Sequence, residues 1–137
     1  MKRYILLLFL IGTTMVSFGQ NSEDTKPKFK FEKELINYGK VVQNSNGNRI
    51  FTFTNTGKSP LIIKDIKTSC DCAIPKKPTD PIMPGGKGSI EVSYDTSKIG
   101  GFSKQITIFS NAKEAIKRIR IKGFVVKSKD TVIKENN

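Results

Sequence analysis

Two cysteines separated by one residue, Cys70 and Cys72, are the side chains of this sequence best suited to chemistry. They are the only cysteines among 137 residues, and Asp71 lies between them. Side chains at positions i and i+2 of a strand point to the same face, and a rise of about 3.3 Å per residue places their Cα atoms about 6.6 Å apart. This separation lies at the outer limit of disulfide reach, about 6.8 Å, so we expect a bridge to be strained and to need a bend of the chain at Asp71.

Three interpretations of this pair remain open. In the first, the cysteines close a small loop at the end of a strand or pack as two thiols, since a buried cysteine usually behaves as a small hydrophobe. In the second, a strained disulfide in an oxidising compartment exchanges with partner thiols. In the third, Cys70 and Cys72 bind a soft metal ion such as Cu(I) as thiolates. Structural zinc is the weakest variant, because it needs four ligands and the chain has no histidine and no further cysteine.

The absence of histidine also bears on enzyme activity. Serine and cysteine hydrolases of the familiar type need an imidazole as the base that activates the nucleophile. No paired carboxylates or phosphate-binding glycine loop with a following helix replaces that arrangement. We therefore predict no catalytic residue, no enzyme activity and no cofactor.

A second candidate site is the group Arg118, Arg120 and Lys122, which we call the basic strip. If Ile119 and Ile121 face the core, the alternation of a strand places the three basic side chains on the opposite face. Charged side chains on an outer or edge strand commonly prevent edge-to-edge pairing. The functional alternative is a docking face for an acidic partner.

The N-terminus has the pattern of a cleavable secretory signal peptide. Lys2 and Arg3 precede an apolar run at 4–11, and a small-residue cleavage site follows at Gly19. A membrane anchor needs roughly 20 predominantly apolar residues, and this run is shorter. We expect residues 1–19 to be removed, the mature chain to have no transmembrane segment, and the protein to reach the periplasm, the cell envelope or the extracellular space.

The mature chain is expected to be strongly basic. The whole chain has a formal charge of +12, and removal of Lys2 and Arg3 leaves 22 basic and 12 acidic residues, a balance of +10. For an exported protein, anionic envelope material or an unidentified protein is the expected partner, and nucleic acid is not. In the alternative interpretation the charge serves solubility alone. The sequence does not predict an oligomeric state.

The residues between these ends alternate with a period of two and are interrupted by turn residues, as in a sandwich or a barrel. The seven strand candidates are 29–31, 35–42, 49–54, 61–66, 89–94, 104–108 and 118–122. The strand at 61–66 is expected to pair with the strand at 49–54 across a turn at 55–60. Seven short strands in about 100 residues predict an all-β, immunoglobulin-like sandwich. We place this domain at 29–126, after a flexible lead at 20–28 and before a disordered tail at 127–137.

Several motifs of this chain resemble those of one known family. They are YGKV at 38–41, FTFTNTGKSPLII at 51–63, TSCDC at 68–72, PIMPGGKG at 81–88 and GFSK at 101–104. Over residues 31–125 the chain resembles the domain-of-unknown-function family numbered 1573, whose members are similar to exported immunoglobulin-fold domains of Gram-negative bacteria. The resemblance implies an exported β-sandwich and brings no activity with it. The cysteine pair of that family usually flanks a glycine, where this chain has Asp71.

The sequence thus predicts an exported immunoglobulin-like domain that acts without catalysis, as a binding or structural module of the cell envelope. The alternative is a thiol redox or copper-handling protein that uses Cys70 and Cys72.

Overall fold

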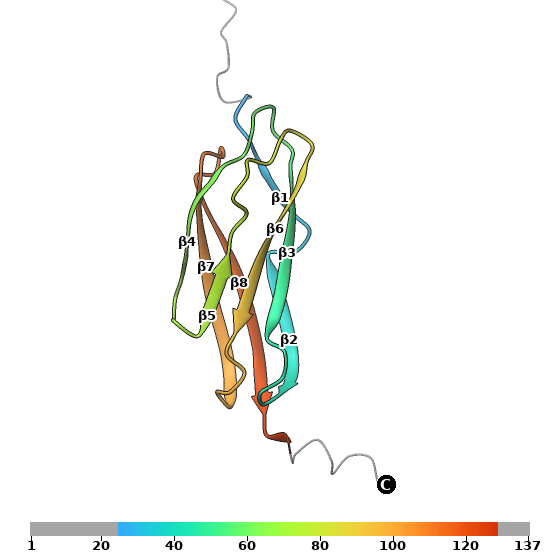
Figure 1. Ribbon diagram of the computed structural model, residues 1–137, viewed down its shortest axis with the longest axis vertical. Coiled ribbons are helices and arrows are strands. Elements are labelled where there is room, and N and C mark those ends of the chain that lie inside the picture. Colours follow the sequence, from blue (N-terminus) through green and yellow to red (C-terminus); the bar gives the residue numbers. More distant parts are fainter. Residues whose placement is uncertain (1–24, 129–137) are drawn as a thin grey trace, which may run out of the picture.

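The computed structural model describes residues 25–128, and its regular secondary structure is a set of eight β-strands (Figure 1). In chain order they are β1 (Phe29–Phe31), β2 (Leu35–Val42), β3 (Asn48–Asn55), β4 (Ile63–Thr68), β5 (Ala73–Lys76), β6 (Lys87–Tyr94), β7 (Gly100–Ser110) and β8 (Ile116–Val126). The predicted signal peptide at 1–19, the start of the predicted lead at 20–24 and the tail at 129–137 lie outside the described residues.

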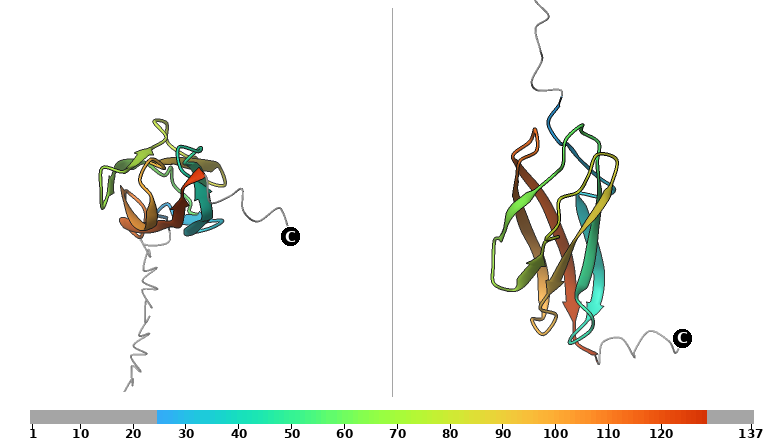
Figure 2. Two further views of the ribbon diagram at one scale, coloured as in Figure 1. Left: turned by 90° about the horizontal axis from the view of Figure 1, so that it is seen from below. Right: turned by 45° about the horizontal axis from the view of Figure 1, so that its top comes forward.

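The strands form two four-stranded sheets that pack face to face (Figure 2). One sheet has the order β1-β3-β6-β5 and the other the order β2-β8-β7-β4; we call them the β3 sheet and the β8 sheet. All neighbouring strands are antiparallel except β2 and β8, which are parallel. The predicted all-β sandwich is confirmed, with eight strands in place of about seven.

The additional strand, β5, has only a weak strand signal in its sequence. It is four residues long, contains Pro75 and pairs only with β6, so it lies at an edge of the β3 sheet. Proline lacks the N–H that a central strand must donate, and edge strands are where it is tolerated. A proline within so short a segment is a poor sequence signal for a strand.

The predicted pairing of 61–66 with 49–54 is wrong. After the turn at 55–60 the chain crosses to the other sheet, where β4 pairs with β7, while β3 has β1 and β6 as its neighbours. Leu61 forms an isolated bridge with Ile82 at the crossing point. Turn residues indicate where a chain reverses, but the strand that it meets next depends on how the two sheets share a core.

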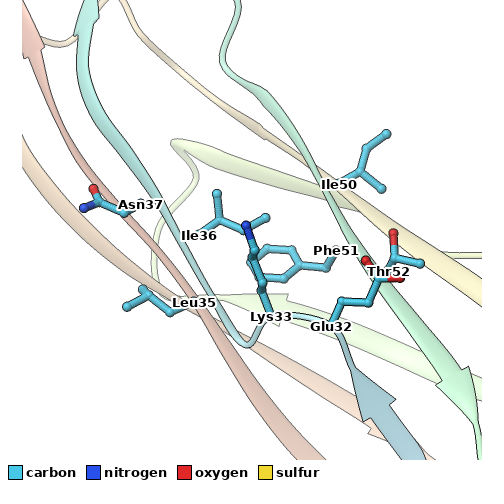
Figure 3. Close-up of a pocket in the computed structure, with 8 residues that line it drawn as sticks. All are labelled: Glu32, Lys33, Leu35, Ile36, Asn37, Ile50, Phe51 and Thr52. Atoms are coloured by element: carbon cyan, nitrogen blue, oxygen red, sulfur yellow. The ribbon is translucent and has the colours of Figure 1, made fainter.

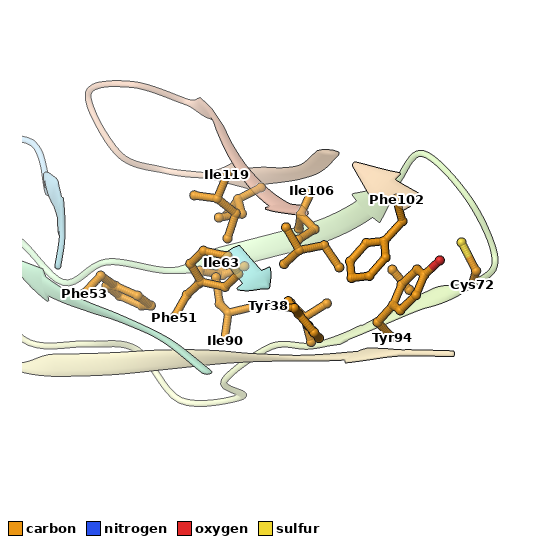
Figure 4. Packing of buried hydrophobic residues seen from close by; sticks show 14 of the residues in the cluster. Tyr38, Phe51, Phe53, Ile63, Cys72, Ile90, Tyr94, Phe102, Ile106 and Ile119 are labelled. Atoms are coloured by element: carbon orange, nitrogen blue, oxygen red, sulfur yellow. The ribbon is translucent and has the colours of Figure 1, made fainter. Parts of the chain in front are cut away.

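That core lies between the sheets and consists of the inward residues of both (Figure 4). Its largest fully buried side chains are Phe51, Phe53, Leu61, Ile90, Val92, Ile106, Ile108, Ile119, Ile121, Val125 and Asn55. Burying one large apolar side chain contributes about 1.5–3 kcal/mol. The alternation of apolar and polar residues therefore determines which face of each strand points inward.

Asn55 is a polar residue within this core, and all of its side-chain polar atoms are satisfied. Its Nδ2 donates to the carbonyl oxygens of Ser59 and Ile82, at 2.7 and 2.9 Å, and its Oδ1 accepts from the N–H of Gly57 at 3.0 Å. A buried amide with its hydrogen bonds made specifies local geometry. Asn55 thus fixes the turn at which the chain leaves the β3 sheet.

Residues 25–28, the described part of the predicted lead, lie against the domain. Pro27 is buried and its carbonyl accepts from the N–H of Lys113 at 2.9 Å. The carbonyl of Lys28 accepts from the N–H of Thr56 at 3.0 Å. A Cβ atom at Gly57 would overlap the carbonyl oxygen of Lys26, so the close passage of this segment requires glycine there.

Tyr38 connects the two sheets at the opposite end of the sandwich. It lies on β2 at a bulge where Gly39 has a φ of 65°, and its hydroxyl donates to the carbonyl of Gly47, just before β3, at 2.7 Å. The guanidinium carbon of Arg49 lies 4.1 Å from the centre of its ring. Burial raises the pKa of Tyr38 to about 12, and the nearby positive charge of Arg49 opposes this shift.

Candidate functional site

The cysteine pair lies in the turn between β4 and β5, where the chain returns from the β8 sheet to the β3 sheet. The Sγ atoms of Cys70 and Cys72 form a disulfide, and their Cα atoms are 5.3 Å apart. The straight-strand separation of about 6.6 Å is thus shortened by a turn at Asp71, which is exposed. The bend expected from the spacing is the one that the structure contains.

Both ends of this turn are held by hydrogen bonds. The carbonyl of Cys70 accepts from the hydroxyl of Thr68 at 2.7 Å, and the carbonyl of Cys72 accepts from the N–H of Asp95 at 2.8 Å. Cys72 is buried at the margin of the core, and Cys70 packs against it from a half-buried position. Metal binding needs thiolates, whereas here the two sulfur atoms are bonded to each other. Within residues 25–128 no cluster of three or more His, Cys, Asp or Glu residues could hold a metal ion.

The basic strip lies on β8, and its side chains have the predicted orientation. Ile119 and Ile121 are buried, and Arg118, Arg120 and Lys122 are exposed on the outer side of the sheet. However, β8 is an inner strand with β2 on one side and β7 on the other. Its main-chain groups are paired on both sides, so the protection of an edge strand does not explain these charges.

Two neighbouring strands extend the strip across the sheet. On β2, Lys40 is the register partner of Phe124, two residues beyond the strip. On β4, Lys67 is the register partner of Thr107, which in turn lies opposite Arg118. Both lysines are exposed. We call these two lysines and the basic strip together the basic face. Lys40 and Lys67 have no local sequence signal for this position, because only the strand order places them beside the strip.

The basic strip differs from its neighbour Lys117 in its ion pairs. Among residues 25–128 no ion pair involves Arg118, Arg120 or Lys122, and Asp65 is the acidic residue on the outer side of the strands of this sheet. By contrast Lys117, one residue before the strip, contacts Glu34 at 2.7 Å and Glu114 at 3.2 Å. The hydrogen bond from Lys117 to Glu34 is the main cause that raises the pKa of Lys117.

Exposed apolar side chains lie directly beside the charges. Phe124 continues the outward positions of β8 and is 49 % exposed, and Leu35, the register partner of Arg120, is 42 % exposed. A flat sheet surface with unneutralised cations and accessible apolar groups offers both long-range attraction and contact area. Such a surface suits a large anionic partner better than a small enclosed ligand.

The two candidate sites are separate. The disulfide lies in the turn after β4, whereas the basic strip lies on β8, and β7 runs between these two strands. The structure therefore does not join the cysteines and the basic residues into one catalytic constellation.

Comparison with known proteins gives a family and a fold. The family model described as "Protein of unknown function (DUF1573)" matches residues 29–125. A search among curated proteins finds no match.

Solved structures resemble the chain at low sequence identity. A protein of unknown function from Porphyromonas gingivalis W83 has a TM-score of 0.66 at 16% identity, with 79% of this chain and 51% of that chain covered. The PapD-like domain 7 of human CEP192 has a TM-score of 0.58 at 9% identity, covering 76% and 89%. The VesB protease of Vibrio cholerae has a TM-score of 0.57 at 16% identity, covering 72% and 32%. The chain thus spans about half of the first of these proteins and about a third of the last.

These matches confirm the immunoglobulin-like β-sandwich, which the PapD-like domain shares with this chain. At such identities they establish the fold and nothing further. Within residues 25–128 there is no helix with the length and apolar character needed to cross a bilayer.

Proposed function

Because the chain belongs to the DUF1573 family of proteins of unknown function, we propose a function from its own structure: it is an exported, non-catalytic binding module of the cell envelope. Its basic face docks on an anionic component of that envelope. The single observation that carries this proposal is the basic strip, three adjacent cations on an inner strand of a sheet that form no ion pair within residues 25–128.

Electrostatics favours a docking role over a structural one. Adjacent like charges on one face repel each other, so Arg118, Arg120 and Lys122 lower the stability of the isolated domain unless something compensates them. An anionic partner supplies that compensation, and guanidinium groups bind carboxylates and phosphates with paired hydrogen bonds. Alternate residues of a strand are about 6.6 Å apart, so the strip offers a row of about 13 Å to an extended anionic surface.

The non-catalytic part of the proposal is supported by the residues that chemistry would need. The chain contains no histidine to act as a base, and the sulfur atoms of Cys70 and Cys72 are bonded to each other. We assign to this disulfide the closure of the turn that leads from the β8 sheet to the β3 sheet. Nothing in the surroundings of the disulfide favours the alternative of thiol exchange or copper handling.

Charge reversal tests the docking role. The triple variant Arg118→Glu, Arg120→Glu and Lys122→Glu is expressed from the full chain, and cells are separated into soluble and envelope fractions. We expect the wild-type protein in the envelope fraction at low salt and the variant in the soluble fraction. Association driven by exposed charges should also decrease with salt, because the Debye length is about 10 Å at 0.1 M.

A matched control distinguishes the face from the charge. Lys30, Lys76 and Lys87 are exposed on the outer side of the β3 sheet, and their reversal to glutamate changes the net charge by the same amount. This control should remain with the envelope. The docking role would be refuted if the triple variant of the basic strip stayed in the envelope fraction, or if both triple variants were released from the envelope to the same extent.

Export has a separate test. Mass spectrometry of the protein recovered from whole cells should give an N-terminus at Gln20, and deletion of residues 2–19 should retain the protein in the cytoplasm. Recovery of the complete chain from Met1 would contradict the export part of the proposal.

A further inference from the structure

One edge of β3 is only partly covered. β1 pairs with β3 through three residues, Phe29–Phe31, and the last bond of this ladder runs from the N–H of Glu32 to the carbonyl of Thr52 at 3.0 Å. The chain then crosses to the other sheet and continues as β2, which pairs with β8. The first half of β3 is therefore left without a neighbour on this side.

The main-chain groups of Ile50 and Thr52 point toward this open edge. In an antiparallel pair the main-chain groups of successive residues point alternately to the two sides of the strand. Asn55 and Gly47 bond toward β6, through Gly86 and Tyr94, so the even-numbered residues between them point the other way. The N–H groups of Ile50 and Thr52 and the carbonyl of Ile50 have no hydrogen-bond partner in the part of the chain that the structure describes.

A groove of about 430 Å³ lies along this edge (Figure 3). Its floor contains Phe51, which is buried, and Ile36, which packs against the core. Ile50 and Leu35 are exposed by 60 % and 42 % at its margins. Glu32 and Lys33, in the connection from β1 to β2, and Asn37 on β2 form the opposite wall. The groove thus combines unpaired main-chain groups with apolar contact surface.

Two other sheet edges, formed by β5 and β4, differ from this one. At the edge of the β3 sheet, β5 contains Pro75 and Lys76, and at the edge of the β8 sheet, β4 contains Lys64 and Lys67. Proline and lysine are the residues that prevent strand addition. The open half of β3 instead presents Ile50, an exposed apolar residue.

We propose that this groove binds an extended segment of a partner polypeptide, which adds to β3 as a strand in continuation of β1. A polypeptide main chain supplies donors and acceptors at the spacing that Ile50 and Thr52 require. Small apolar side chains of the segment pack over Phe51 and Ile36. The sheet edge of a second copy needs more room than one extended segment, and the wall of the groove borders the open stretch of β3, so we assign an isolated segment and not a second copy. The site borders the basic face at Leu35, the register partner of Arg120, but it is argued from the unpaired main-chain groups of β3 and does not depend on the docking role proposed above.

The probe is a phage-displayed library of random octapeptides selected on the mature chain, residues 20–137. We expect the enriched peptides to carry apolar residues at alternate positions. When the synthetic peptide is added, NMR hydrogen exchange should slow at the amides of Ile50 and Thr52. A library that yields no binder, or protection confined to other strands, overturns the proposal.

Two variants test the groove, and one control matches them. Thr52→Pro removes an N–H that faces the open edge, a position at which proline is tolerated in a strand, and should weaken peptide binding about tenfold, the loss of one hydrogen bond. Ile50→Thr removes the apolar margin and should also weaken binding. Ile62→Thr changes an isoleucine that is 46 % exposed outside the groove and should bind as the wild type does.

The chain's own C-terminal residues are the competing occupant. If the amides of Ile50 and Thr52 are protected in the free protein and lose this protection when residues 129–137 are deleted, the groove serves the chain itself. A partner polypeptide is then ruled out. Our proposal requires that the amides of Ile50 and Thr52 exchange fast in the free protein, both in the full mature chain and in the chain without residues 129–137.

Discussion

The two sheets of this sandwich have similar inner faces and different outer faces. Inward, both contribute aliphatic and aromatic residues to one core, such as Ile90 on β6 and Ile106 on β7. Outward, the β3 sheet places Thr52 opposite Ser89, whereas the β8 sheet carries the basic face. Since a sandwich needs only its inner faces to be apolar, the basic face is not a requirement of the fold.

The difference between the outer faces identifies where function is to be sought. The outer side of the β3 sheet also carries three exposed lysines, but Lys30, Lys87 and Lys76 lie on three different strands, and Lys76 is the register partner of Glu91. The basic strip instead places three cations at successive outward positions of one strand, where like charges repel, and β8 is not an edge strand. Like charges that the fold does not require, and that lower its stability, are typical of a binding surface.

The largest effect expected from this comparison concerns the inner faces. Ile90→Ala and Ile106→Ala, one from each sheet, should each lower the free energy of unfolding by about 2–5 kcal/mol, since both side chains are fully buried. Denaturant unfolding followed by circular dichroism measures the loss. Ser89→Ala and Ser103→Ala, on the outer sides of the two sheets, should change the free energy of unfolding by no more than about 0.5 kcal/mol. A small loss for either isoleucine would contradict the shared core.

The disulfide should have a smaller effect, confined to stability. The double variant Cys70→Ala and Cys72→Ala opens a loop of three residues, for which the loop-entropy relation gives about 1.5 kcal/mol. The variant should unfold at lower denaturant concentration and still fractionate with the envelope. Loss of envelope association without loss of stability would instead assign the cysteines to function.

Tyr38→Phe tests the link between the two sheets. It should lower the free energy of unfolding by about 1 kcal/mol, because it removes the buried hydrogen bond from the Tyr38 hydroxyl to the carbonyl of Gly47. The pKa of Tyr38 is raised from 10.0 to about 12 in the folded protein, so the neutral phenol stabilises the fold. This contribution is complete below about pH 10 and is lost as the pH rises through about 12. The wild type should therefore lose stability between these pH values, and the variant should lose less. Parallel pH profiles for the two proteins would contradict the assignment.

Alternation along the sequence predicted most strands because burial has the same period. The segments at 29–31 and 35–42 coincide with β1 and β2, and the alternation of β8 correctly separated Ile119 and Ile121 from the basic strip. β5 was not predicted, because Pro75 weakens the strand pattern in a segment of only four residues. The partner of β4 was predicted wrongly, because pairing depends on a crossing between sheets that no local pattern records.

The candidate sites were predictable only in part, for the same reason. Cys70, Cys72 and the basic strip lie within single short segments, so their spacing could be interpreted directly. Lys40 and Lys67 join the basic face through strand order, and the groove beside Ile50 exists because β1 leaves β3 after three residues. Sites built across strands require the topology, which emerges only from the packing of the whole chain.

Site-specific photo-crosslinking tests the central claim most directly, because it reports which outer face meets the partner. Ser103 on β7 is the register partner of Lys122, and Ser89 on β6 is that of Thr52; both are exposed serines on inner strands. A photoreactive amino acid replaces each in turn, and the cells are irradiated. We predict crosslinks to an envelope component from position 103 and none from position 89. Equal crosslinking from both positions, or crosslinks from position 89 alone, would contradict the assignment of the β8 sheet as the docking face.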